Sequence, residues 1–246
     1  MPNTPINSLP PTRVSPLYFI IVLLTISIVA VITYFVTSEQ NTMQSTTPDT
    51  LQFSTLAGAQ KQNGLDLINP SVLLNNTNSP AVGATASEAK VTVVEFLDFQ
   101  CPYCQVSASM VKQLIARYQG KKVRFIFRNL PLQSLHPYAV TAAHASLCAN
   151  AQGKFLPMYD VLYTHQSEIN PENLYTFARD SNLNMSTFSK CMVAGSYQTQ
   201  IQKDFSDGVA LGAQGTPTWF INGKMFEGAL SLETMSAIID ATLATP

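Results

Sequence analysis

Two cysteines three residues apart, Cys101 and Cys104, come directly after an apolar, β-branched run and directly before a helical pattern. The run at 91–99 predicts a buried strand, and Pro102 suits the first position of a helix because its missing N–H is not needed there. A helix N-terminus presents unsatisfied N–H groups, which favour a thiolate on the first cysteine. The chain must therefore fold so that a reactive thiol pair lies at the end of a strand.

The helix after the cysteines is predicted from a stripe of apolar residues that recurs every four positions: Val106, Met110, Leu114 and Tyr118. Gly120 then ends the helix. Because the cysteines are three residues apart, both sulfurs lie on the same side of the first turn. We predict that Cys101, at the exposed end, reacts with substrates and that Cys104, further in, resolves the mixed disulfide.

A Cys-x-x-Cys pair can also form half of a zinc site or a structural disulfide. Zinc needs two further ligands at suitable spacing. In this chain Cys148 and Cys191 stand alone, and the histidines are scattered: His136, His144 and His165. A disulfide across so short a loop constrains the unfolded chain little. We therefore favour redox chemistry, and we expect neither a metal nor a cofactor. We interpret His136, which precedes a proline, as a cap or surface residue.

Residues 17–36 form an apolar run of twenty residues without a charge. A helix of that length spans about 30 Å, the hydrocarbon thickness of a bilayer. Tyr18 and Tyr34 lie near its ends, where aromatic side chains favour the membrane interface. No convincing A-x-A cleavage site follows the run, so we predict an uncleaved signal anchor. A cleaved signal peptide is the alternative.

The charges that flank this run predict its orientation. Arg13 and the terminal amine precede it and Glu39 follows it, so the positive-inside rule keeps residues 1–16 in the cytoplasm. The rest of the chain would then be exported into an oxidising space, where the four cysteines can form disulfides. A net charge of −1 gives no electrostatic reason to expect nucleic acid as a partner.

The exported part divides into a polar linker at 37–70, rich in Thr, Ser, Gln and Asn, and a folded domain at 71–246. Strand patterns are predicted at 81–83, 91–98, 123–127, 218–221 and 224–227. A long helical insert is predicted at about 135–211, and Asn222-Gly223 predicts a tight hairpin turn. A final helix follows the hairpin.

This order of elements is a thioredoxin-type layout interrupted by helices. The segment VVEFLDFQCPYC, followed by the insert and GTPTWFING, resembles the DsbA-like thiol–disulfide oxidoreductases of bacteria over about residues 79–245. The resemblance implies an α/β thioredoxin-like fold with an all-helical insertion, here preceded by an N-terminal transmembrane helix. It also implies that a membrane quinone-linked partner re-oxidises the cysteine pair.

The resemblance further implies that Thr216 and Pro217 form a cis-proline loop facing the cysteines. Such a loop leaves backbone groups free to pair with an extended substrate. The alternative is that the two residues merely open an edge strand. Glu95 falls in an otherwise apolar strand, and the family has a buried acid there. Burial would raise its pKa and let it exchange a proton with Cys104, whereas the alternative is a solvated residue.

Tyr103 stands where strongly oxidising family members carry a histidine that stabilises the thiolate. Pro-Tyr is instead the glutaredoxin dipeptide, and glutaredoxins are less oxidising than DsbA. We count Tyr103, with Thr216 and Pro217, among the substrate-binding residues. With the active-site pair set aside, only a Cys148–Cys191 bridge remains, and some family members staple the insert in this way. Two buried thiols are the alternative.

Together these features predict a single-pass protein of the bacterial inner membrane, with its catalytic domain on the periplasmic or extracellular side. Its predicted activity is the donation of disulfides to exported client proteins that carry free thiols. One alternative is an isomerase or reductase of the same fold. Another is a surface binding protein that uses the fold as a scaffold and does not need its cysteines.

Overall fold

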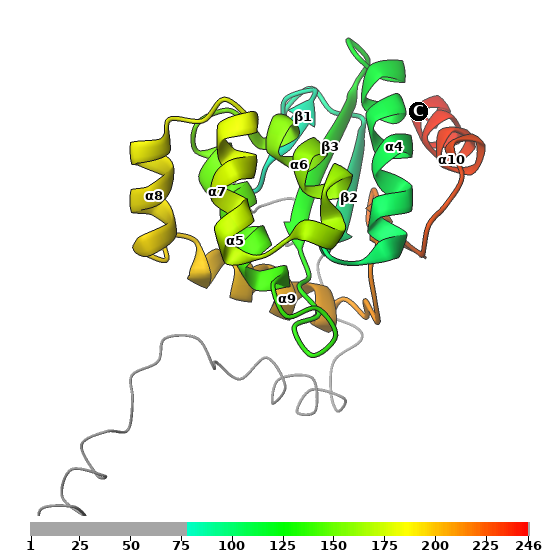
Figure 1. The fold of residues 1–246 in the computed structure, drawn as a ribbon. Helices are drawn as coiled ribbons and strands as arrows, with labels where there is room; N and C mark the ends of the chain where they lie inside the picture. The colour runs from blue at the N-terminus through cyan, green and yellow to red at the C-terminus, as the bar shows by residue number, and fades with distance from the viewer. Residues whose placement is uncertain (1–77, 246) are drawn as a thin grey trace, which may run out of the picture. The chain divides into compact units, whose positions relative to one another are not determined.

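The computed structural model describes residues 78–245, so the predicted signal anchor and linker lie outside the described part. Its elements follow the predicted order (Figure 1). They are β1 (Ala81–Gly83), β2 (Val91–Leu97), α4 (Pro102–Arg117), β3 (Val123–Asn129), α5 (Ala139–Asn150), α6 (Phe155–Thr164), the 3-10 turn η1 (Gln166–Glu168), α7 (Pro171–Asp180), α8 (Met185–Val193), α9 (Gln198–Ala210), β4 (Thr218–Ile221), β5 (Lys224–Glu227) and α10 (Leu232–Ala244).

The strands form a five-stranded sheet in the order β1-β3-β2-β4-β5. β2 and β3 are parallel, as expected for a strand–helix–strand crossover, and the other neighbours are antiparallel. The β4–β5 hairpin turns at Asn222 and Gly223, both with positive φ. The centre of the sheet is therefore β2, which leads directly into the two cysteines.

Successive side chains of β2 point to opposite faces of the sheet. Val93 and Leu97 join the larger hydrophobic core, which includes residues of α4, α6 and α10. Val94 and Phe96 pack with Phe205 of α9 on the other face. By this alternation Glu95 lies on the same face as Val93 and Leu97, beneath the helix that carries the cysteines. Figure 1 shows α4 and α10 side by side, on the opposite side of the molecule from α8.

Two helices of the insert, α7 and α8, begin at asparagines that cap them. Asn170 accepts a hydrogen bond from the Asn173 N–H at 2.8 Å, and Pro171 occupies the first turn of α7. Asn184 accepts in the same way from the Thr187 N–H at 3.0 Å and begins α8. These caps separate the insert into short helices that pack on one another and on the sheet.

A disulfide joins Cys148 of α5 to Cys191 of α8, 43 residues apart in the sequence. Both helices belong to the insert, so the bond closes the insert on itself. His144 lies close to the two sulfurs, with the ligand atoms of the three residues within 4.8 Å of one another. Because the sulfurs are bonded to each other, this group offers no thiolate to a metal.

Replacing both Cys148 and Cys191 by alanine should destabilise the domain but leave thiol–disulfide exchange largely intact at low temperature. Closing a loop of this length contributes about 4 kcal/mol on the chain-entropy model. Thermal unfolding and a turnover assay on the same preparation measure the two effects separately. If the double variant had the same melting temperature as the wild type, the bond would add no stability.

A buried ion pair fixes α9 to the sheet. Arg128 of β3 is fully buried, and its Nε donates a hydrogen bond to Asp204 Oδ1 at 2.8 Å. The guanidinium also pairs with Asp207 and lies over the Phe96 ring. Since α9 leads into β4 through residues 211–217, this ion pair holds the start of the loop that reaches the cysteines.

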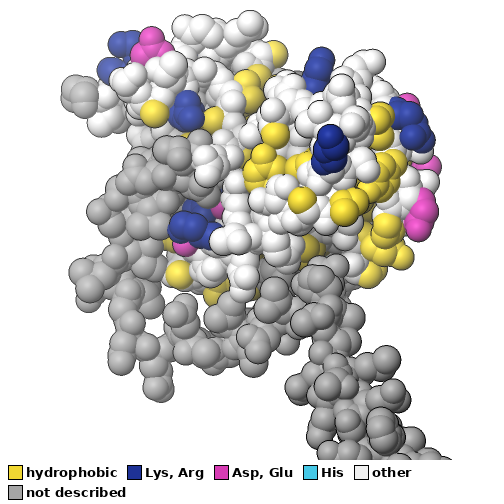
Figure 2. Space-filling model, turned by 90° about the vertical axis from the view of Figure 1, so that its left-hand side faces the viewer, with side chains coloured by type: hydrophobic (Ala, Val, Ile, Leu, Met, Phe, Trp, Pro, Cys, Tyr) yellow, Lys and Arg dark blue, Asp and Glu magenta, His cyan; other side chains and the backbone are white. Residues whose placement is uncertain are grey.

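Among residues 78–245 no helix is both long and apolar enough to cross a membrane; the predicted span at 17–36 is not part of that range. Figure 2 looks onto the side of the molecule where α8 lies in Figure 1 and shows apolar side chains gathered among scattered charged ones. This sparse charge fits the 12% share of charged residues in the whole chain.

Candidate active site

The two redox cysteines lie where β2 ends and α4 begins. Cys101 is the N-cap residue of α4, Pro102 is at the start of the helix, and Cys104 is in its first turn. Cys101 is 4% exposed, Cys104 is fully buried, and both are free thiols. Their order along the helix places Cys101 nearer the surface, as the sequence predicts.

Hydrogen bonds to the Cys101 sulfur favour its thiolate. Donation from the Cys104 thiol is the largest cause, and the pKa of Cys101 falls to about 5 although burial opposes the shift. The backbone N–H groups of Tyr103 and Cys104 add smaller contributions, as expected at a helix N-terminus. A thiolate at neutral pH makes Cys101 both a good nucleophile and a good leaving group.

Cys104 is shifted in the opposite direction. Burial is the first cause that raises its pKa, followed by its hydrogen bond to Cys101 and by the nearby Glu95 carboxylate. The pair therefore holds its single negative charge on Cys101, while Cys104 keeps its proton. This difference suits a pair in which one sulfur meets substrates and the other closes the disulfide.

Glu95 lies in the core near Cys104 and is 2% exposed. Burial raises the pKa of its carboxyl to about 8, and the Tyr159 hydroxyl of α6 lowers it by less. Neither carboxyl oxygen has a partner at normal hydrogen-bond distance and angle among residues 78–245. The solvated alternative for Glu95 is wrong, because the strand places this side chain on the core face of the sheet.

The loop before β4 faces the cysteines from the other side. The Thr216–Pro217 peptide bond is cis, and the Cys101 thiol donates a hydrogen bond to the Thr216 carbonyl at 3.1 Å. The buried Thr216 hydroxyl has no partner within 78–245 while Cys101 is a thiol, and its donation to the thiolate lowers the pKa of Cys101. Thr216 thus contacts the reactive sulfur, and its cis bond to Pro217 belongs to the same loop.

A family model described as thioredoxin matches residues 75–241, more than half of the chain. A thioredoxin-like oxidoreductase from Silicibacter pomeroyi has a similar structure, with a TM-score of 0.63, 26% identity, and 72% of this chain and 99% of that chain covered. The chain belongs to this thioredoxin family. The predicted fold, a thioredoxin-like domain with helical content, is confirmed by the same matches.

Two further similarities extend this comparison. The thiol-disulfide exchange protein alpha-DsbA2 from Wolbachia pipientis has a TM-score of 0.63 at 23% identity, covering 70% of this chain and 91% of that chain, which shows the fold alone. The Na(+)/H(+) antiporter NhaA 3 of Salinispora tropica is 37% identical over 158 residues, 64% of this chain. Those residues are only 24% of the antiporter, so its transport activity is not assigned to this chain.

The exposed face around the cysteines is more apolar than the predicted helix stripe implies. Val106, predicted to be buried, is 68% exposed, and Ser107 is buried in its place. Tyr103 is 65% exposed on the preceding turn. The prediction for Val106 is wrong because α4 turns the face with Cys104, Ser107 and Val111 toward the core, which leaves Val106 on the outer side.

Sequence reasoning missed several residues that hold the redox turn in this oxidoreductase. Asp98, buried between β2 and the cysteines, binds His136 of the loop after β3, with 2.7 Å between Oδ2 and Nδ1. Gln166 of η1 donates hydrogen bonds to the Phe99 and Cys101 carbonyls, both at 2.9 Å. An acid at a strand end next to a Cys-x-x-Cys pair is a visible signal, but the glutamine lies 65 residues away and gives none.

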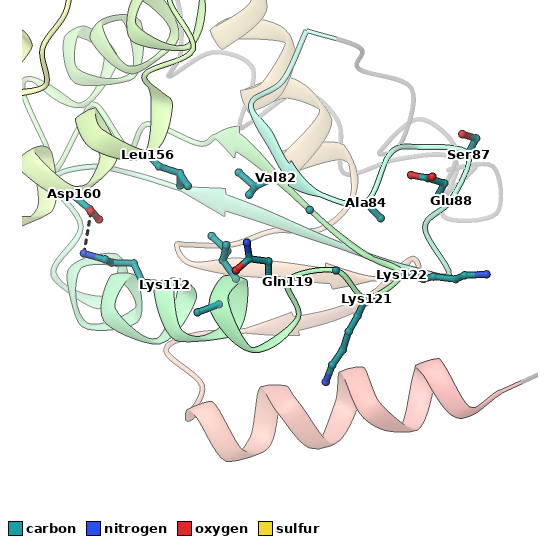
Figure 3. A pocket seen from close by; sticks show the side chains of 14 residues that line it. Val82, Ala84, Ser87, Glu88, Lys112, Gln119, Lys121, Lys122, Leu156 and Asp160 are labelled. Carbon is teal, nitrogen blue, oxygen red and sulfur yellow. Dashed lines mark ion pairs between the residues drawn. The ribbon is translucent and has the colours of Figure 1, made fainter.

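A cavity of about 1080 Å³ lies away from this site, between β1, the C-terminal half of α4 and α6. Figure 3 shows Val82 and Leu156 lining it, with the Lys112–Asp160 ion pair at one side. Neither cysteine lines it. The chemistry of the enzyme is therefore carried by the surface around Cys101 and not by this cavity.

Proposed function

We propose that this enzyme is anchored in the bacterial inner membrane and donates the Cys101–Cys104 disulfide to exported proteins with free thiols. The observation that carries the proposal is the opposite shift of the two thiols. A stabilised Cys101 thiolate favours the reduced form of the pair, and a pair with a stable reduced form is a good oxidant.

In the proposed reaction a client thiolate attacks Cys101 Sγ of the oxidised pair, and the bond between Cys101 and Cys104 breaks. Cys104 leaves as a thiolate, takes up a proton and becomes the buried thiol. A second client thiolate then attacks the client sulfur of the mixed disulfide and expels Cys101 as a thiolate. The client gains one disulfide and the enzyme gains two electrons, so the cycle needs an oxidant, which in this proposal is a quinone-linked membrane partner.

Exposed apolar residues around the cysteines support an unfolded client as substrate. Two are on α4 and two on the loop between β3 and α5: Tyr103, Val106, Leu135 and Tyr138, with exposed fractions of 65%, 68%, 72% and 37%. Large apolar side chains on a surface indicate a contact site for protein. Client segments that still expose apolar side chains would bind there while the Thr216–Pro217 loop pairs with their backbone.

The proposal is tested by mixing the oxidised enzyme with a reduced, unfolded exported protein and counting the disulfides that form. We expect stoichiometric transfer, followed by the reduced enzyme. An isomerase would instead rearrange a scrambled client and be found reduced in cells. A Cys101/Cys104 double variant that retains full function in cells would support the scaffold alternative.

Alkaline extraction of membranes tests the anchor, because a cleaved protein would leave the membrane fraction.

Replacing Tyr103 by histidine should make the enzyme more oxidising. The pKa of Cys101, about 5, lies between values of about 7 for thioredoxin and about 3.5 for DsbA. We therefore expect a potential between about −270 and −120 mV, nearer the glutaredoxin range. An imidazolium at position 103 would stabilise the thiolate further. Equilibration with glutathione measures the reduction potential of the wild type and of Tyr103→His. A wild-type potential at the DsbA end of the range would show that Tyr103 does not limit the oxidising power.

A further inference from the structure

Asp98 joins two loops beside the redox pair. It follows β2 directly, three residues before Cys101, and is 2% exposed. Its Oδ1 accepts a hydrogen bond from the Gln100 N–H at 2.8 Å. Its Oδ2 accepts from the Leu132 N–H at 2.8 Å and lies 2.7 Å from His136 Nδ1. One buried carboxylate thus binds the turn at 98–101 and the loop at 130–138 at the same time.

The backbone of the same residue closes the turn. The Asp98 carbonyl accepts from the Cys101 N–H at 3.1 Å and from the Tyr163 hydroxyl at 3.4 Å. The Gln100 side chain adds a second link to the other loop by accepting from the Tyr138 N–H at 2.6 Å. Among residues 78–245 no hydrogen bond joins the carboxylate to either sulfur. Asp98 can therefore affect Cys101 only through the shape of the turn or through its charge.

We propose that Asp98, together with His136, is a positioning residue for thiol–disulfide exchange. Its carboxylate holds the turn so that the N–H groups of Tyr103 and Cys104 remain directed at Cys101. Hydrogen bonds to a charged acceptor are about twice as strong as neutral ones, and breaking one in the interior leaves a donor unpaired. The carboxylate also binds the loop that carries Leu135 to this turn, so the exposed apolar residues keep a fixed position relative to the Cys101 sulfur.

The two ways in which Asp98 can act predict opposite changes in the reduction potential when the residue is replaced. Asp98→Asn keeps the size of the side chain but removes its charge and sets an NH₂ group against the Leu132 N–H or the imidazole. If Asp98 positions the turn, the acid dissociation constant of Cys101 should fall about tenfold, which lowers the reduction potential by about 30 mV. If only its charge mattered, removing a negative group would favour the thiolate and raise the potential.

The thiolate absorbance of Cys101 against pH, and equilibration with glutathione, measure both quantities on the enzyme with its Cys148–Cys191 bond intact. His136→Phe should give a smaller change of the same sign, since the Leu132 N–H still binds Asp98. If Asp98→Asn does not fold, His136→Phe alone tests the proposal. Asp160→Asn is the matched control, because it removes a carboxylate from the exposed Lys112 ion pair, and it should change neither quantity.

An unchanged Cys101 pKa and potential in the folded Asp98 and His136 variants would overturn the proposal. A raised potential would overturn it as well and would assign Asp98 an electrostatic effect. Either result leaves the direction of disulfide transfer untouched, because that direction is read from client oxidation by the wild type.

Discussion

Cys104→Ser is expected to accumulate mixed disulfides with client proteins, whereas Cys101→Ser should accumulate none. In the Cys104 variant, the Cys101 thiolate still attacks a client disulfide and forms a mixed disulfide, but the enzyme's own resolving thiol, Cys104, is missing and can no longer displace the client. The Cys101 variant retains only a buried thiol whose pKa is raised by burial, so it reacts slowly. Turnover should fall to the uncatalysed rate in both variants.

To measure the mixed disulfides, cells are quenched with acid, free thiols are alkylated, and the proteins are separated by electrophoresis without reductant. The Cys148/Cys191 double variant is the matched control, since it also lacks cysteines but should trap no more client than the wild type. Equal trapping by Cys101→Ser and Cys104→Ser would contradict the assigned roles. Trapping by Cys101→Ser alone would reverse them.

Much of this arrangement could be predicted from local sequence. Apolar alternation in β2, Pro102 after the first cysteine and Asn222-Gly223 in the hairpin each specify structure within a few residues, and the elements lie where these signals place them. Val106 shows where this reasoning ends. Its four-residue spacing fits a buried stripe, but burial depends on how the helix is turned against its neighbours, and α4 buries the face with Ser107 and Val111 instead.

The contacts that tune the cysteines come from distant segments. Asp98 meets Leu132 and His136 only because the parallel pairing of β2 and β3 brings both strand ends to the same edge of the sheet. A histidine before a proline gives no sign of that pairing and by itself predicts only a cap or surface residue. The hydrogen bonds from Gln166 require the path of the whole insert, which periodicity alone does not specify.

Glu95→Gln is expected to remove a large pH dependence of stability. The carboxyl has a pKa of about 8 in the folded domain because burial disfavours its charge, against about 4.3 in the unfolded chain. The fold therefore favours the protonated form. Its contribution is fully present below the unfolded pKa and is lost as pH rises through about 8, at up to about 1.36 kcal/mol per pH unit.

The total loss is on the order of 4–5 kcal/mol between pH 4 and pH 9. Glutamine has no charge to bury, so Glu95→Gln should match the wild type near pH 4 and exceed its free energy of unfolding at pH 9. Urea unfolding measures this, with Cys101 and Cys104 both replaced by serine so that their own titration does not contribute. Glu88→Gln is the control, because the Glu88 side chain is exposed and its pKa is lowered by Thr85, not raised. Parallel stability curves for wild type and Glu95→Gln would mean that Glu95 ionises in the folded state as readily as in water. The buried acid could then not hold a proton for Cys104 at neutral pH.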